Sequence, residues 1–202
     1  MSLANDFEQY KRELKLIKAQ NPYEHELYSI IACVMRDRKS SRGISIRDVS
    51  GDRKSKKLCT GNFYSKSGFP DFVILSLEYR AGKQIDENNL RDGGVLGAIE
   101  AKHINEAIDN PEQSKTKHIN QLKKHIEYFK KVIYTNGLVW QFYESDHNNK
   151  RRKPKWTWEV SLGYNEWNNK QGTEQKSDQC IKWASVEKWN ELLSRLDEIR
   201  WK

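Results

Sequence analysis

Cysteine is scarce in this 202-residue chain, and long apolar runs are missing. The three cysteines, Cys33, Cys59 and Cys180, form an odd number without the paired spacing of a zinc site, so we expect free thiols in a reducing compartment. No apolar stretch approaches the ~20 residues of a membrane-spanning helix. The N-terminal residues are too charged to resemble a signal peptide. The sequence therefore predicts a soluble, cytoplasmic protein with no membrane partner.

Acidic residues are outnumbered by basic ones. The chain has 36 Lys and Arg against 28 Asp and Glu, a formal net charge of +8. A basic protein of this kind favours a polyanionic partner, and nucleic acid is the simplest one. The length suffices for one hydrophobic core, so we expect a single domain over 1–202. Its core would span about 21–144, and 145–202 would add a C-terminal strand and helix extension.

The spacing of apolar residues predicts a mixture of helices and strands. Helical spacing indicates a helix over 7–20, a second helix that Asn21 and Pro22 begin, a long helix from Asn110 to about Lys131, and a last helix from Ser185. Alternating or continuous apolar runs indicate strands at 44–49, 71–75, 95–102, 132–143 and 156–162, the fourth interrupted by a Thr-Asn-Gly turn.

Two of these strands carry charged residues whose spacing suits a metal-dependent nuclease. Asp71 opens one apolar run, and Glu100 and Lys102 follow the uncharged run 95–99. If the two strands are neighbours, side-chain alternation places all three residues on one face. Two carboxylates suit Mg²⁺, which also binds phosphate oxygens, and an adjacent lysine can position or deprotonate the attacking water. The chemistry implied is phosphodiester hydrolysis.

Each half of this pattern also has an ordinary structural explanation. Pro-Asp often opens a turn, and Glu-x-Lys is common on a surface strand of a basic protein. Burial favours the functional interpretation. A carboxylate such as Glu100, at the end of an uncharged strand, is costly unless it is paired or bound to a metal.

The order of elements and motifs over about 21–144 resembles the PD-(D/E)xK nuclease superfamily. Holliday-junction resolvases of this superfamily show a helix-opening glutamate, a strand ending in Ser-Gly, then Pro-Asp and Glu-x-Lys. Nuclease domains of type I restriction subunits carry a Gln-Leu helix that leads into a strand with Thr-Asn-Gly. The matching residues here are Glu24, Val49-Ser50-Gly51, Pro70-Asp71, Glu100-Ala101-Lys102, Gln121-Leu122 and Thr135-Asn136-Gly137. The resemblance implies an α/β fold of the restriction endonuclease-like type, a central mixed β-sheet flanked by helices.

The resemblance and the chemistry together assign roles to the motif residues. Asp71 and Glu100 would bind Mg²⁺, which Mn²⁺ can replace, with the backbone carbonyl of Ala101 as a third ligand. Lys102 would orient the water or stabilise charge that builds on the phosphate. Gln121, on the long helix, would contact substrate or water.

The helix glutamate of the site is either Glu24 or Glu26. Glu24 has the family's spacing to the apolar helix positions, but it also fits a capping box that begins at Asn21. His118 and His125 on the long helix are expected only to border the core, since an isolated histidine is seldom a ligand.

DNA contacts are expected in the basic loop before the Asp71 strand. Its residues Arg53, Lys54, Lys56 and Lys57 could reach phosphates near the cleaved one, whereas the basic run 150–155 is expected to be peripheral. The predicted function is a Mg²⁺-dependent, restriction-like endonuclease acting on double-stranded or branched DNA. The alternatives are a structure-selective, junction-resolving nuclease and a non-catalytic nucleic-acid-binding module of the same fold. The sequence leaves open the preference for DNA over RNA and whether the protein is a homodimer.

Overall fold

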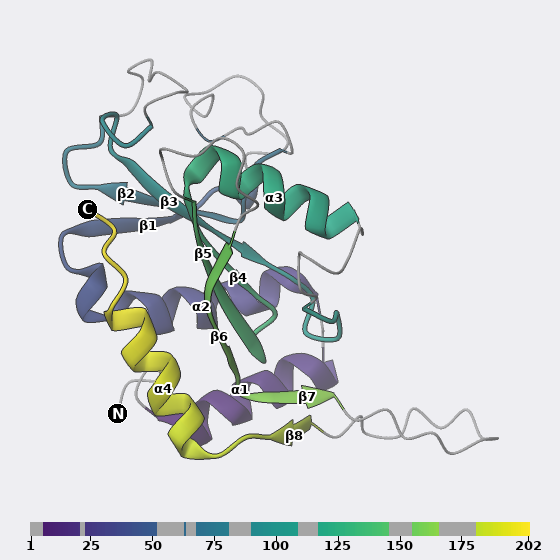
Figure 1. Ribbon diagram of the computed structural model, residues 1–202. Helices are drawn as coiled ribbons and strands as arrows, with labels where there is room; N and C mark the ends of the chain where they lie inside the picture. Colours follow the sequence, from purple (N-terminus) through teal and green to yellow (C-terminus); the bar gives the residue numbers. More distant parts are fainter. Residues whose placement is uncertain are drawn as a thin grey trace.

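The computed structural model describes residues 6–20, 23–51, 63, 68–80, 90–108, 117–145, 155–165 and 181–202, which form an α/β protein (Figure 1). A six-stranded sheet has the strand order β1-β2-β3-β4-β5-β6. These strands are β1 (Ile44–Asp48), β2 (Phe72–Ser76), β3 (Val95–Ala101), β4 (Lys131–Thr135), β5 (Val139–Glu144) and β6 (Lys155–Ser161). A separate pair joins β7 (Gly163–Asn165) to β8 (Ile181–Trp183).

The large sheet is mixed, as the sequence predicts. Strands β1, β2 and β3 pair antiparallel, β3 and β4 pair parallel, and β5 and β6 continue antiparallel. The parallel pair requires a crossover, because a short hairpin cannot join strands that run in the same direction. Helix α3 (Lys117–Phe129) lies within that crossover.

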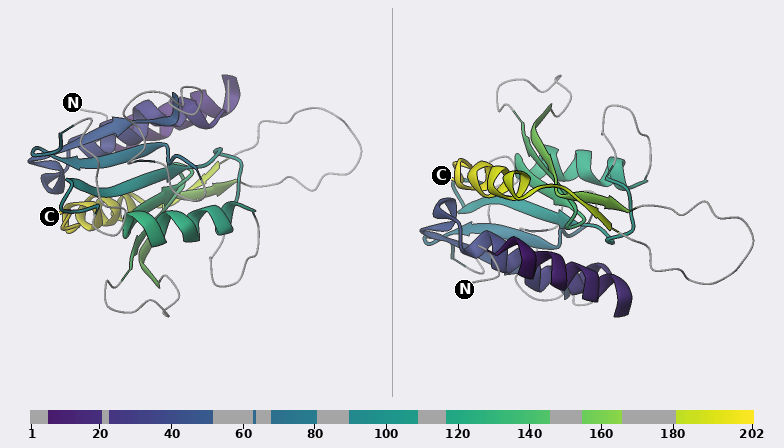
Figure 2. Two further views of the ribbon diagram at one scale, coloured as in Figure 1. Left: turned by 90° about the horizontal axis from the view of Figure 1, so that it is seen from above. Right: turned by 90° about the horizontal axis from the view of Figure 1, so that it is seen from below.

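Helices cover both faces of the sheet (Figure 2). On one face α1 (Phe7–Gln20), α2 (Leu27–Arg36) and α4 (Val186–Asp197) share a core with inward residues of the sheet, such as Ile74 and Ile133. On the other face α3 buries Ile119, Leu122 and Ile126 against Val73 and Val132. Short 3₁₀ turns, η2 (Glu24–Glu26) and η3 (Lys39–Ser41), flank α2.

The structure confirms the predicted interruption of 132–143, since β4 ends at Thr135 and β5 begins at Val139, and it corrects one predicted boundary. The long helix ends at Phe129 and not at Lys131, because Lys130 adopts a left-handed conformation (φ 68°) and Lys131 already begins β4. The last helix has Ser185 at its N-cap position, as expected. The predicted starts at Asn21 and Asn110 lie outside the described residues.

The turn between β4 and β5 is held by hydrogen bonds of its own and by one from α1. The Asn136 side-chain oxygen accepts hydrogen bonds from the N–H groups of Leu138 (2.9 Å) and Val139 (2.8 Å), and Gly137 has a φ of 85° that favours glycine. The carbonyl of Gly137 accepts a hydrogen bond from the Tyr10 hydroxyl (2.6 Å). The turn is thus held by its own sequence and by α1.

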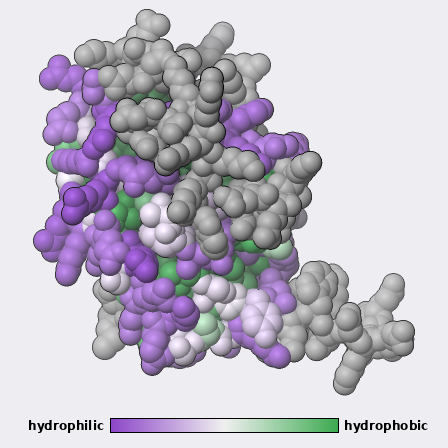
Figure 3. Space-filling view, viewed as in Figure 1, coloured by the Kyte–Doolittle hydropathy of each residue, from purple (hydrophilic) through white to green (hydrophobic). Residues whose placement is uncertain are grey.

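The surface agrees with the basic, polar composition. The face drawn in Figure 3 is largely hydrophilic, with hydrophobic atoms only in small areas. Within the described part of the chain, none of the helices combines the length and apolar character needed to cross a membrane.

Candidate active site

Asp71 lies at the entrance to β2 and is fully buried. Its backbone is fixed from both sides, since its N–H donates to the Ile99 carbonyl (3.2 Å) and its carbonyl accepts from the Val49 N–H (2.9 Å). Its carboxylate accepts two further hydrogen bonds, from the Tyr28 hydroxyl to Oδ1 (2.5 Å) and from the Ala101 N–H to Oδ2 (2.7 Å). The acid is therefore rigidly positioned between α2 and β3.

Glu100 and Lys102 form a buried ion pair at the end of β3. The Lys102 Nζ lies 2.6 Å from Glu100 Oε1, and the two residues are 3% and 1% exposed. Strand alternation puts both side chains on the same side, as the sequence predicts. The Lys102 N–H donates to the Thr135 carbonyl (2.8 Å), which extends the parallel β3–β4 pairing by one residue.

His125, on α3, completes this cluster and was not expected there. It is fully buried, its Nε2 lies 3.4 Å from Glu100 Oε2, and Gln121 Nε2 lies 3.4 Å from the same ring nitrogen. Gln121 therefore reaches the cluster through His125. The sequence did hold a signal, because both residues belong to a polar stripe one position away from the apolar seam of the helix, but the prediction assigned His125 to the border of the core.

Glu24 is the helix glutamate that faces the cluster. Its Oε1 lies 3.2 Å from the Tyr28 hydroxyl, which also donates to Asp71. Glu26 instead pairs with His25 Nε2 (3.2 Å) and is 40% exposed. The geometry thus brings together Glu24, Asp71, Glu100 and Lys102, which arise from three separate segments of the chain.

The surroundings shift the pKa values of the two buried acids in opposite directions. Burial raises the pKa of Asp71 well above its usual range, the charges of Glu100 and Glu24 raise it further, and the Tyr28 and Ala101 hydrogen bonds only partly offset this. Burial also acts to raise the pKa of Glu100, but the His125 contact and the charge of Lys102 outweigh it, so that pKa is lowered. Opposed shifts of neighbouring acids are typical of catalytic sites.

The pKa of Lys102 is raised. Its burial acts to lower the pKa, but the adjacent Glu100 carboxylate outweighs that effect through charge and hydrogen bonding, with Glu24 and Asp71 adding to it. The Glu100–Lys102 pair is therefore charged at neutral pH, and Lys102 is an ammonium that donates hydrogen bonds rather than a free base.

The donor chemistry of the cluster fits a magnesium ion. Asp71 and Glu100 supply carboxylate oxygens, and Glu100 Oε2 is buried with only the long 3.4 Å approach of His125 Nε2 and no well-formed hydrogen bond from the described residues. Mg²⁺ commonly binds through one or two carboxylates and completes its shell with water and phosphate oxygens. The described residues contain no ready-made group of three or more acidic, histidine or cysteine ligands. Binding would therefore rest on these two carboxylates and on oxygens from outside the protein.

The remaining predicted site residues have varied outcomes. The Ala101 N–H donates a hydrogen bond to Asp71. The role of the Ala101 carbonyl as a metal ligand stays a prediction. Arg53, Lys54, Lys56 and Lys57 lie outside the described residues, as does all but the last residue of 150–155. His118 pairs with Glu106 (3.3 Å) and is 47% exposed, away from the core that it was expected to border.

The chain has no match among protein-family models, curated proteins or solved structures. The assignment of function therefore rests on the fold and on the geometry of this cluster.

Proposed function

We propose that this protein is a Mg²⁺-dependent endonuclease that hydrolyses phosphodiester bonds of DNA. The observation that carries the proposal is the convergence of Asp71, Glu100 and Lys102 in one buried cluster. Glu100 and Lys102 share a side because they are two residues apart at the end of β3, whereas Asp71 lies at the entrance to a different strand, β2, so its place beside them is not a consequence of closeness in the chain. The fold class adds support, because the order α2-β1-β2-β3-α3-β4, with β3 and β4 parallel, is the order expected of a restriction endonuclease-like domain.

Each residue has a distinct task in this proposal. Asp71 and Glu100 hold the ion, and their positions are fixed by Tyr28, Ala101 and His125. When bound, Mg²⁺ supplies Lewis-acid polarisation of the phosphate and of the attacking water. Lys102 donates hydrogen bonds to the water or to the charge that develops on the phosphate, because its raised pKa keeps it an ammonium. Deprotonation of the water by Lys102 is disfavoured for the same reason.

A purely structural role for the cluster is the main alternative. Buried ion pairs are weak sources of stability, since desolvation can exceed the attraction between the charges. A second acid, Asp71, is held beside the pair with a raised pKa, which destabilises the folded protein at neutral pH. Such an arrangement favours selection for chemistry over selection for stability, and it argues against a module that only binds nucleic acid.

The direct test is cleavage of supercoiled plasmid DNA in Mg²⁺, in Ca²⁺ and in EDTA. We expect nicking or linearisation in Mg²⁺ only. Glu100→Gln should lower the rate by about 100-fold or more, because it removes the charge that holds the ion. Glu144→Gln is the matched control, since Glu144 pairs with Lys131 (3.4 Å) and is 48% exposed.

Two results would overturn the proposal. One is robust cleavage in EDTA by the purified protein. The other is a Glu100→Gln variant that folds normally and cleaves as fast as Glu144→Gln.

A further inference from the structure

Two aromatic side chains stack on the surface at the start of α2. The rings of Tyr23 and His25 are nearly parallel, with an interplanar angle of 12° and centroids 5.8 Å apart. Both are well exposed, Tyr23 at 61% and the His25 side chain at 64%. Large exposed rings are uncommon in the described part of the chain, where Tyr164 is the comparable aromatic side chain.

The local backbone holds this pair in place. Tyr23 is extended (φ −66°, ψ 148°) and precedes the turn η2, and its carbonyl accepts a hydrogen bond from the Glu26 N–H (3.1 Å). His25 is further fixed by its contact with Glu26 (3.2 Å). These contacts restrict the backbone at Tyr23 and the side chain of His25 before any ligand arrives, which reduces the entropy lost on binding.

The stacked pair lies next to the candidate active site. Glu24 stands between the two aromatic residues in the chain, and its Oε1 lies 3.2 Å from the Tyr28 hydroxyl, which donates to Asp71. One turn of the chain thus presents a carboxylate to the cluster and two rings to solvent. A nucleic acid whose phosphate reached Asp71 would carry its neighbouring bases past these rings.

We propose that Tyr23 and His25 form a stacking platform for an unpaired nucleobase next to the cleaved phosphate. Aromatic rings bind bases through their faces without regard to sequence, and a base inside a duplex has no face to offer. The platform therefore selects branched, gapped or single-stranded DNA over continuous duplex. This inference rests on the proposed nuclease function. It specifies that the nuclease is structure-selective and prefers DNA with unpaired bases.

The experiment compares a gapped duplex, with 2-aminopurine at the unpaired position, and a fully paired duplex of the same sequence. Affinity is measured in Ca²⁺ and cleavage in Mg²⁺. We expect the wild-type protein to bind the gapped DNA at least about fivefold more tightly and to quench the 2-aminopurine fluorescence. Tyr23→Ala should lose both effects, while Tyr23→Phe, which keeps the ring, should retain them.

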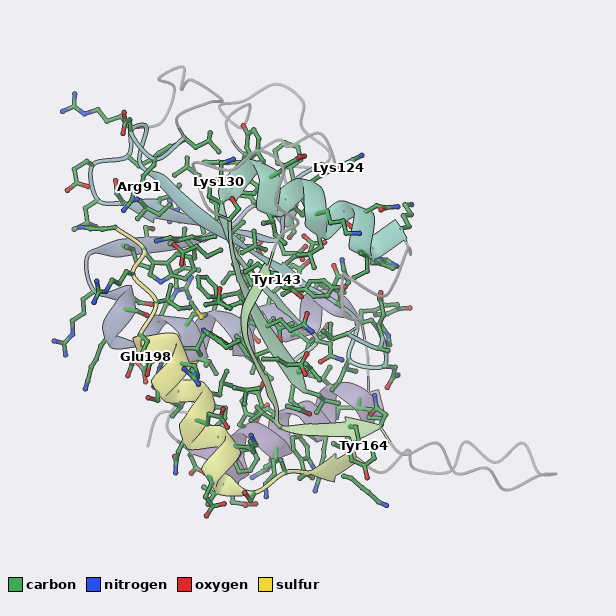
Figure 4. The ribbon with its side chains drawn as sticks, in the orientation of Figure 1. Arg91, Lys124, Lys130, Tyr143, Tyr164 and Glu198 are labelled. Carbon is green, nitrogen blue, oxygen red and sulfur yellow. The ribbon has the colours of Figure 1, made fainter. Side chains whose placement is uncertain are left out.

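Tyr164→Ala is the control for the general effect of removing an exposed tyrosine. Tyr164 is 58% exposed on β7, paired with Lys182 of β8, and lies well below α3 in Figure 4. Circular dichroism of each variant checks that the fold is retained, which is expected because Tyr23 is a surface residue.

The outcomes separate this inference from the proposed function. Cleavage in Mg²⁺ with equal affinity for the two substrates, or a preference that Tyr23→Ala retains, overturns the platform alone. A Tyr23-dependent preference without any cleavage overturns the hydrolytic function and leaves the platform standing. Failure of the wild-type protein to bind either DNA overturns both.

Discussion

The two faces of the sheet bury very different side chains. Under α1, α2 and α4 the core is the larger one and contains the buried tryptophans of the described residues, with Trp189 stacked on Phe7 (centroids 5.6 Å apart) and close to Tyr10 (4.6 Å). Under α3 the apolar core is smaller, and it adjoins the buried charges of Glu100 and Lys102. One face buries mainly apolar side chains, and the other also buries the charges of the candidate active site, which cost stability.

A second contrast lies within the core under α1, α2 and α4, to which both Tyr10 and Tyr28 belong. Tyr10 donates to a neutral backbone carbonyl, that of Gly137, and receives a hydrogen bond from Trp140 Nε1 (3.3 Å). Tyr28 donates to the Asp71 carboxylate. One hydroxyl thus makes a contact that holds the fold, and the other orients a candidate catalytic acid, which makes the two residues a matched pair for mutation.

The largest effect on stability is expected from Trp189→Ala. Removing this fully packed ring should lower the free energy of unfolding by about 3–5 kcal/mol, because it leaves a cavity. Cleavage per folded molecule should not change. Urea denaturation, followed by far-ultraviolet circular dichroism, measures the free energy of unfolding. A cleavage assay corrected for the fraction of folded protein measures the rate per folded molecule. A loss below about 1 kcal/mol would mean that the aromatic core is not the main source of stability.

Lys102→Ala should affect both stability and function. It leaves the Glu100 carboxylate buried without its partner, so we expect a loss of about 3–5 kcal/mol together with loss of cleavage. Replacing both charges, with Lys102→Met and Glu100→Leu, should recover most of the stability but none of the activity. Glu144→Gln, which breaks the exposed pair with Lys131, should cost less than about 1 kcal/mol.

The pH dependence of this pair follows from the pKa shifts. The lowered pKa of Glu100 adds stability that is fully present above the ordinary pKa of a glutamate and is lost as the pH falls through the lowered value. The raised pKa of Lys102 adds stability that is present below the ordinary pKa of a lysine and is lost as the pH rises through the raised value. The free energy of unfolding contributed by the Glu100–Lys102 pair should therefore not change with pH between these limits. In the double variant Lys102→Met, Glu100→Leu, the losses of this contribution at acid and at alkaline pH should disappear.

Tyr28→Phe should cost about 1–2 kcal/mol, because it removes a hydrogen bond to the buried Asp71 carboxylate. Tyr10→Phe should cost less, because the Gly137 carbonyl keeps its hydrogen bond from Trp140 Nε1 (3.3 Å). Only Tyr28→Phe should slow cleavage, because it removes a hydrogen bond that positions the Asp71 carboxylate and lowers its pKa. Equal cleavage rates for Tyr10→Phe and Tyr28→Phe, measured at several Mg²⁺ concentrations, would show that the Tyr28 hydroxyl has no part in the site.

The smallest effect on stability, and one of opposite sign, is expected from Asp71→Asn. The raised pKa of Asp71 means that stability is lost as the pH rises from the ordinary aspartate pKa through the raised value, so the ionised acid is a burden at neutral pH. The neutral amide should stabilise the protein by about 0.5–2 kcal/mol at pH 7 while abolishing cleavage. A destabilised variant with a flat pH profile would contradict the assigned pKa shift.

The sequence was sufficient for the features that depend on local pattern. Apolar spacing predicted the order of the four α-helices and of strands β1 to β6, but not the short strands β7 and β8, and strand alternation predicted that Glu100 and Lys102 share a side. Asp71 was found because a proline-aspartate pair opens a buried run. These features arise within a few residues of one another.

The features that depend on packing between distant segments were missed. His125 meets Glu100 only because of the angle at which α3 crosses the sheet, and no spacing within the helix encodes that angle. Tyr28 looked like one more apolar residue of α2, although its hydroxyl reaches Asp71, 43 positions away in the chain. The left-handed Lys130 was unpredictable for a further reason, since a lysine has no preference for that conformation.

We expect the β4–β5 turn to couple the two faces of the sheet. The carbonyl of Thr135, the last residue of β4, accepts the Lys102 N–H (2.8 Å), and the carbonyl of Gly137, two positions on, accepts the Tyr10 hydroxyl (2.6 Å). An opening fluctuation of this turn would release both contacts together. The amide hydrogens of Lys102 and Trp140 should then exchange with solvent with similar protection, close to that of global unfolding, although one belongs to the charged cluster and the other to the aromatic core.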